Sequence, residues 1–142
     1  MIILSQDITN TATATCSVNK QLSSPTYLWS MRHKLTNRSW KFIPYRIPPS
    51  VAYNPSYDLF EIEVDYNKPE VFIYSAGTPC NLHLYSGDYF VKIYEQVSTT
   101  NLNPQLSYDV VYETTARLDN DTDTYTEIAY TGTTDTFKVY KG

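Results

Sequence analysis

Two histidines have the side chains that titrate nearest neutrality, so they are the first candidates for acid–base or metal chemistry. His33 ends the run TYLWSMRH, and His83 lies between Leu82 and Leu84 in LHLYS. A two-histidine site requires both rings to converge with carboxylates, and nothing in their spacing indicates this. In a strand, His83 points to the face opposite the two leucines, which is the outward face. We therefore assign no catalytic residue and no metal ligand to the histidines.

Two glutamates, Glu61 and Glu63, form a second candidate, because paired carboxylates can act on a glycosidic bond. In LFEIEV they alternate with Phe60, Ile62 and Val64, so a strand places the glutamates together on one face. A catalytic pair requires one carboxylate in a desolvated pocket. We interpret the alternation as a half-buried strand with a solvated acidic face.

A run of acidic residues near the C-terminus resembles a calcium-binding loop, because hard cations require several carboxylate oxygens brought together by a tight turn. The run consists of Asp119, Asp121, Asp123 and Glu127. An EF-hand loop has glycine at its sixth position and glutamate at its twelfth, whereas this run has Thr124 and Tyr130 there. We interpret it as a polar hairpin tip, with bound calcium as the alternative.

Other signatures of catalysis and nucleotide binding are missing from the sequence. It has no G-x-S-x-G nucleophile motif, no glycine-rich phosphate loop and only four glycines. Its densest basic stretch alternates with aromatic residues, as on the solvated face of a strand. The basic members are Arg32, His33, Lys34, Arg38, Lys41 and Arg46. Because the formal net charge is also −4, we expect no nucleic-acid partner, no catalysis and no cofactor.

The chain contains 14 tyrosines, more than a small core readily buries. Exposed aromatic rings on a β-sandwich can stack on sugars, and tyrosine is also enriched in the cores of protein interfaces. We expect some of these side chains to contact a partner, which the spacing does not identify. The candidates are Tyr85, Tyr89, Tyr94, Tyr108 and Tyr112.

The elements that must position these side chains are short strands rich in β-branched and aromatic residues, separated by Pro, Gly and Asn turns. Expected strands cover residues 2–4, 11–18, 26–33, 40–47, 59–64, 71–76, 82–86, 89–97, 109–118 and 136–140. No window shows a sustained helical stripe. The pattern predicts an all-β antiparallel sandwich, immunoglobulin-like or jelly-roll, with little or no helix.

Alternation within the strands predicts which side chains face the core. The expected core positions include Ala12, Ala14, Cys16, Val18, Trp40, Phe42, Tyr45, Tyr89, Val91 and Ile93. Phe90, Lys92 and Tyr94 lie on the opposite face of their strand. Pro44 indicates a sheet edge or a bulge, and the proline-rich segment 48–58 an irregular connection.

At 142 residues the chain fits one domain, 1–142, with a Thr/Asp-rich C-terminal segment 119–142. Cys16 and Cys80 are too few for a disulfide framework, and we expect buried or half-buried free thiols, as in a reducing cytoplasm. No apolar run is long enough to span a membrane, and MIIL is too short for a signal peptide. We expect no membrane association.

Four segments carry a resemblance to a known family: SSPTYLWSM, WKFIPYRI, SGDYFVKIYEQVSTTNLNP and VVYETTARL. They resemble small virion structural proteins of tailed phages of Bacteroidetes, including crAss-like phages. The most specific part is Y-x-V-K-I-Y-E-Q followed by N-L-N-P. The chain departs from the family at Ser30 and Met31, where Glu and Phe are usual, and in an enlarged loop at 44–57.

The resemblance implies a non-catalytic protein of the virion, assembled in the host cytoplasm: a capsid decoration or head-fibre component, or a collar or tail component. It also implies a homo-oligomer with capsid, portal, collar or fibre proteins as partners. An edge strand or terminus can donate hydrogen bonds to another subunit. The expected docking elements are the N-terminal strand 1–8 and TDTFKVYKG at 134–142. A carbohydrate-binding module for adhesion to glycans is the alternative.

Overall fold

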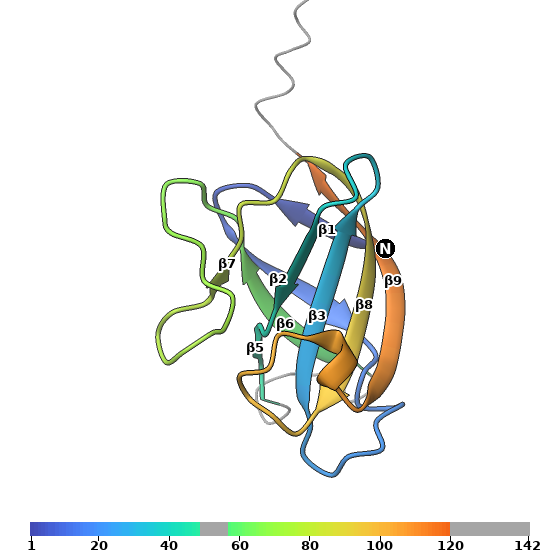
Figure 1. Cartoon of the computed structure of the whole chain (residues 1–142). Helices are drawn as coiled ribbons and strands as arrows, with labels where there is room; N and C mark the ends of the chain where they lie inside the picture. The colour runs from blue at the N-terminus through green and yellow to red at the C-terminus, as the bar shows by residue number, and fades with distance from the viewer. Residues whose placement is uncertain (49–56, 120–142) are drawn as a thin grey trace, which may run out of the picture.

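The computed structural model describes residues 1–48 and 57–119, which form two facing β-sheets (Figure 1). One sheet has five strands in the order β1 (Ile2–Ser5), β9 (Asp109–Asp119), β8 (Gly87–Gln96), β3 (Thr26–His33) and β4 (Ser39–Phe42). The other sheet contains β2 (Thr9–Ala14), β6 (Asp58–Glu63) and β5 (Tyr45–Arg46), with β7 (Cys80–Asn81) beside β6. The prediction of an all-β sandwich is confirmed.

Most neighbouring strands are antiparallel, and the exceptions are the pairs β1–β9 and β6–β7. Helical structure in the described residues is limited to the short 3-10 turn η1 (Pro104–Leu106). Figure 1 shows the five-stranded sheet in front of the smaller sheet, so each sheet has one inner and one outer face.

The core between the sheets is built by the alternation of the strands. In β8, which lies between β3 and β9, Tyr89, Val91 and Ile93 are buried, while Phe90 and Lys92 are exposed on the outer face. The predicted faces of this strand are therefore confirmed. Other core residues include Ala12, Ala14, Trp29, Trp40, Phe42, Phe60, Ile62 and Val64.

The chain crosses from the larger sheet to the smaller sheet at Pro44. The strand β4 ends at Phe42 in the larger sheet, and β5 begins at Tyr45 in the smaller sheet. Proline lacks a backbone N–H, so it fits this corner where strand pairing is interrupted. The expectation of an edge or bulge at Pro44 is confirmed.

Two expected strands are wrong. Residues 71–76 form only isolated bridges, and Phe72 and Tyr74 are partly exposed. In 82–86, Leu82 and Leu84 are buried without forming a strand. The His83 N–H donates to the Glu70 carboxylate, and the Tyr89 hydroxyl donates to the Tyr85 carbonyl, so side chains satisfy backbone groups of this loop instead of a strand ladder.

A further correction concerns Val18, which alternation assigned to the core and which is 67% exposed. The strand β2 ends at Ala14, and a turn then redirects the chain. The expected strand 136–140, the acidic residues Asp121, Asp123 and Glu127 and most of the proline-rich loop lie outside the described residues.

Candidate functional site

The two histidines occupy separate places with separate partners. His33 is buried, with Nδ1 at 3.0 Å from Thr36 Oγ1 and Nε2 at 3.0 Å from the Ser86 carbonyl oxygen. His83 is half-buried, and its Nε2 lies 2.6 Å from the Lys68 carbonyl oxygen. Each ring therefore lies within hydrogen-bond distance of different residues.

The two glutamates share the outer face of β6, as the alternation predicted, but they differ in environment. Glu63 is buried, and its carboxylate accepts a hydrogen bond from Lys68 Nζ at 3.0 Å. Glu61 is half-buried and pairs in register with Tyr45 on β5 and with Thr11 on β2. Among the described residues its carboxylate has no hydrogen-bond or ion-pair partner, so it can accept bonds from a ligand.

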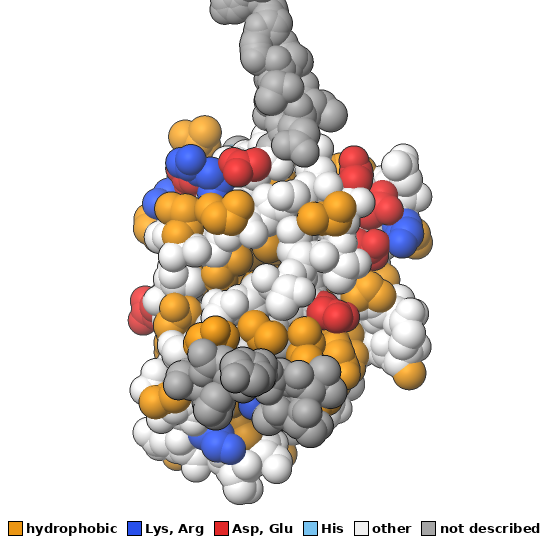
Figure 2. Space-filling model, turned by 180° about the vertical axis from the view of Figure 1, so that it is seen from behind, with side chains coloured by type: hydrophobic (Ala, Val, Ile, Leu, Met, Phe, Trp, Pro, Cys, Tyr) orange, Lys and Arg blue, Asp and Glu red, His pale blue; other side chains and the backbone are white. Residues whose placement is uncertain are grey.

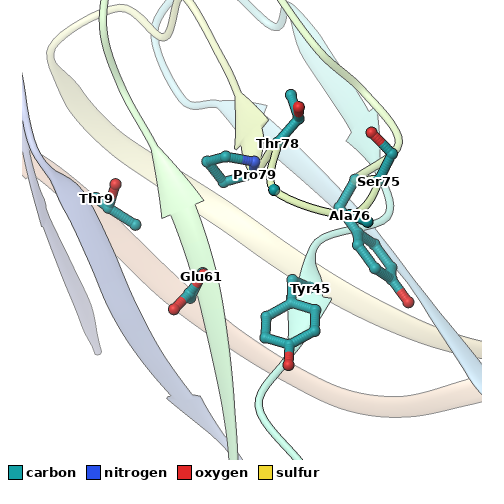
Figure 3. Close-up of a pocket in the computed structure, with 9 residues that line it drawn as sticks. Thr9, Tyr45, Glu61, Ser75, Ala76, Thr78 and Pro79 are labelled. Atoms are coloured by element: carbon teal, nitrogen blue, oxygen red, sulfur yellow. The ribbon is translucent and has the colours of Figure 1, made fainter.

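Glu61 lies in a groove of about 670 Å³ over the outer face of the smaller sheet. Its lining residues are Thr9, Tyr45, Glu61, Tyr74, Ser75, Ala76, Gly77, Thr78 and Pro79. They come from β2, β5, β6 and the turn that precedes β7 (Figure 3). Figure 2 shows this side of the molecule, where hydrophobic side chains gather over the lower half and most of the charged ones lie toward the upper left and upper right.

The turn beside the groove is held by two reciprocal backbone hydrogen bonds. Ser75 N–H donates to the Thr78 carbonyl at 3.0 Å, and Thr78 N–H donates to the Ser75 carbonyl at 2.9 Å. Gly77 has φ +76°, a left-handed conformation that glycine adopts without steric cost. The Tyr74 N–H donates to the Ile43 carbonyl at 3.1 Å, which joins this turn to the segment just before β5, the strand that carries Tyr45.

Two tyrosine rings meet in the groove. The centroids of Tyr45 and Tyr74 are 5.4 Å apart with an interplanar angle of 64°, an edge-to-face arrangement. Because the two rings are not coplanar, a ligand in the groove can contact the face of one ring and the side of the other. Alternation assigned Tyr45 to the core, whereas it is half-buried in the groove. Tyr74 was not singled out, because residues 29 positions apart along the chain gave no joint pattern.

The tyrosines that the sequence did single out are divided between core and surface. Tyr89 is fully buried, and its hydroxyl donates to the Tyr85 carbonyl at 2.5 Å. Burial raises its pKa above the ordinary value. Tyr85 and Tyr108 are exposed, and Tyr94 and Tyr112 are half-buried. They lie on the larger sheet and its connections, away from the groove residues.

The basic stretch does not form one patch. The cations of Arg32 and Lys34 lie over Phe90 at 4.7 and 4.6 Å from the ring centroid, on the outer face of the larger sheet. Arg38 lies over Trp40 and Tyr85. Arg46 belongs to the smaller sheet. The cations are therefore divided between the two sheets.

Both cysteines are buried free thiols, as predicted. Burial raises the pKa of Cys80 to about 12, and its thiol donates a hydrogen bond to the Ile43 carbonyl. Burial and the nearby Asp58 carboxylate also raise the pKa of Cys16 above its ordinary value. Both thiols are therefore protonated and unreactive near neutrality.

Two buried carboxylates were missed by sequence reasoning. Asp58 accepts hydrogen bonds from the backbone N–H groups of Cys16 and Ser17, and Glu95 accepts from those of Gln21 and Leu22. Both lie at strand ends, where a charged residue usually signals solvent. These carboxylates hold loops in place and do not converge on a common cavity.

Over residues 1–48 and 57–119, no group of three or more metal-ligating side chains comes together, and no helix is long and apolar enough to cross a membrane. Of the predicted acidic run, only Asp119 is described, at the end of β9. A scan against protein-family models and searches of curated proteins and of solved structures found no match to this chain. Its function is therefore inferred from its own residues.

Proposed function

We propose that this chain is a non-catalytic structural protein of a tailed-phage virion, a capsid decoration or head-fibre component. Two features support the proposal. One is the resemblance carried by YFVKIYEQ and NLNP, a segment that here includes the central strand β8. The other is the open side of the edge strand β1, which the described residues leave available for another subunit.

The edge strand β1 is the main structural support for a role in assembly. Within the described part of the chain β9 is its only strand partner, so its other edge presents backbone groups without a strand partner. Ile2 and Leu4 point into the core, whereas Ile3 is 54% exposed. Met1 and Ile8 are exposed at the same end of the chain. An open edge with exposed apolar side chains is suited to pairing with a second chain.

This arrangement changes how the N-terminal segment 1–8 would act. We expected it to dock as a strand or extended terminus on a neighbour. In the folded chain it already pairs with β9, with Ile2 opposite Ala116 and Leu4 opposite Leu118. We propose that it docks through its outer edge while it remains in its own sheet. The second expected docking element, 134–142, lies outside the described residues.

The test is a substitution that alters the edge without emptying the core. Ile3→Lys places a charge on the exposed side of β1, where lysine blocks strand addition, and leaves Ile2 and Leu4 in place. We expect the wild-type chain to copurify with capsid or portal proteins of its phage when they are co-expressed. The variant should keep its unfolding temperature and lose this copurification.

The matched control is Val18→Lys, which adds the same charge at an exposed apolar residue in the turn after β2. It should assemble as the wild type does. Deletion of residues 1–8 is a poor test, because it removes two core side chains together with the edge. Normal assembly of Ile3→Lys would overturn the docking role, and association with tail or collar proteins would place the chain there instead. A wild-type chain that copurifies with no virion protein would overturn the proposed function.

A further inference from the structure

We propose that the groove over the smaller sheet binds a neutral oligosaccharide through Tyr45, Tyr74 and Glu61. This goes beyond the assembly role and does not depend on it, since the groove and the β1 edge belong to different sheets. A virion protein with both surfaces would attach to the particle by one sheet and to a glycan by the other.

The size and lining of the groove suit a small, partly apolar ligand. Its volume of about 670 Å³ lies within the range of roughly 300–1,000 Å³ that small-molecule sites occupy. Apolar surface comes from the two tyrosine rings, Ala76 and Pro79, and hydroxyl groups come from Thr9, Ser75 and Thr78. A sugar ring has the same division, with C–H groups on its faces and hydroxyls at its rim.

The tyrosine pair supplies the apolar contact. The face of an aromatic ring carries negative charge density, which attracts the weakly positive C–H groups of a sugar. Because Tyr45 and Tyr74 are set at 64°, one ring can stack on a sugar face while the other bounds its side. Backbone hydrogen bonds hold the main chain on both sides of the pair before a ligand arrives, which lowers the entropic cost of binding.

Glu61 supplies the polar contact. A carboxylate is a strong acceptor that can take two hydrogen bonds from neighbouring hydroxyls of one sugar. No described residue forms a hydrogen bond or ion pair with the Glu61 carboxylate, in contrast to Glu63, which is paired with Lys68. Figure 3 shows Glu61 on β6 between Thr9 on β2 and Tyr45 on β5, so the acceptor is flanked by a hydroxyl and an aromatic ring.

The charge of the lining selects against acidic ligands. Glu61 is its one ionisable carboxylate, and none of the nine lining residues is lysine, arginine or histidine. A uronic acid, sulfate or phosphate group would place like charge beside Glu61 without a cation to offset it. A neutral oligosaccharide meets no such repulsion. The same lining disfavours an acidic peptide.

The experiment measures binding of the whole chain to defined oligosaccharides by calorimetry and by amide NMR shifts. The neutral probes are maltohexaose, cellohexaose, mannohexaose and xylohexaose, and the acidic probe is a galacturonate hexamer. We expect at least one neutral probe to bind and to shift the amides of residues 74–79, and the acidic probe not to bind. Tyr45→Ala and Tyr74→Ala should each lower the affinity by about tenfold, or about 1.4 kcal/mol. Glu61→Gln should lower it by a similar factor.

Matched controls lie outside the groove. Tyr108→Ala removes an exposed tyrosine near the larger sheet, and Glu113→Gln neutralises an exposed glutamate on β9. Both should bind as the wild type does. The proposal is overturned if none of the neutral probes binds, if the galacturonate hexamer binds preferentially, or if the folded double variant Tyr45→Ala, Tyr74→Ala keeps wild-type affinity. None of these results bears on copurification with virion proteins, so the two proposals fail separately.

Discussion

The guanidinium of Arg46 lies 2.6 Å from the carboxylate of Asp58 and ties β5 to the first residue of β6. The Asp58 side chain is 2% exposed, and it also accepts hydrogen bonds from the backbone N–H groups of Cys16 and Ser17 at 3.0 and 2.8 Å. One carboxylate thus joins the end of β2, β5 and β6. Since β5 also carries Tyr45, this ion pair helps to position the groove.

Asp58→Asn should destabilise the fold strongly. The amide cannot accept all the bonds that the carboxylate accepts, and its NH₂ group faces either the backbone donors or Arg46. We expect a loss of about 2–4 kcal/mol in the free energy of unfolding, as for a buried charged partner. Urea denaturation followed by the fluorescence of the buried Trp29 and Trp40 measures it.

The control for this prediction is Asp88→Asn. Asp88 and Arg117 form an ion pair at 2.8 Å with both side chains well exposed. Solvent screens such a pair, so its loss should change the free energy of unfolding far less than Asp58→Asn does. Equal effects of the two substitutions would contradict the structural role given to Asp58.

The stability of the protein should depend on pH through Asp58. Burial alone raises the pKa of this carboxyl, but the hydrogen bond from Ser17 and the Arg46 guanidinium outweigh it and hold the pKa below its ordinary value of 3.8. The folded state therefore binds this proton less readily than the unfolded state does. Stabilisation is present above pH 3.8 and is lost as the pH falls through the lower folded pKa.

Urea denaturation at a series of pH values from neutral downward tests this. The wild type should lose stability below pH 3.8 more steeply than Asp58→Asn, which has no such group to protonate. Parallel curves for the two proteins would show that other carboxyls govern acid unfolding.

The sequence predicted the parts of the fold that depend on local periodicity. In β6 and β8, apolar and polar residues alternate at a period of two, so Phe60, Ile62, Val91 and Ile93 were placed correctly on the core face. The same rule failed for 71–76, because an apolar run looks the same in a strand and in a loop whose backbone groups pair only through isolated bridges, here to Ile43 and Asn81.

The candidate site was only partly predictable. Alternation placed Glu61 on an outer face, but the groove also needs Tyr45, Tyr74 and Thr9, which lie on three other segments. Their approach depends on the crossing between the sheets at Pro44, where the sequence indicated only an edge or a bulge, and on the packing of the 71–79 loop, which has no local signal. Asp58 was missed for the same reason, since its backbone donors are 41 and 42 residues away along the chain.

Gly87→Ala should be more costly than Gly77→Ala. Gly87 has φ +123°, and a Cβ atom there would lie 3.0 Å from Nε2 of His33, whose ring is fixed by two hydrogen bonds. We expect a loss of about 1–3 kcal/mol from strain and displacement of the imidazole. Gly77 at φ +76° has open space around it, so alanine there should cost only about 1 kcal/mol. Thermal unfolding of both variants compares them, and equal costs would contradict the close packing of His33.

The two thiols should resist alkylation in the native state. At pH 8 a thiol whose pKa is about 12, as burial makes that of Cys80, is almost entirely protonated. The buried Cys16 should behave in the same way. Mass spectrometry after iodoacetamide treatment should find no adduct on the folded protein and two adducts in urea, with or without reductant. Rapid labelling of the folded chain, or labelling that requires reductant, would contradict buried free thiols.

Glu95→Gln should release the loop between β2 and β3. The Glu95 side chain is buried at the end of β8, and its carboxylate accepts from the backbone N–H groups of Gln21 and Leu22, each at 3.0 Å. The amide offers one acceptor oxygen and turns its donors toward those N–H groups, so we expect a loss of about 1–3 kcal/mol. Hydrogen exchange of the Gln21 and Leu22 amides should accelerate more than that of Val91 in the middle of β8.

Comparing these amides within one protein distinguishes local opening of the loop from global unfolding. Global unfolding would accelerate the hydrogen exchange of all three amides by the same factor. Glu113→Gln on the exposed face of β9 is the control and should leave all of them unchanged. If all three amides of Glu95→Gln instead exchanged faster by the same factor, the carboxylate would stabilise the sandwich as a whole. If the loop amides did not change, their hydrogen bonds to Glu95 would not be what protects them, and the loop would be held by its other contacts, such as the bond from Asn19 Nδ2 to the Val111 carbonyl at 3.0 Å.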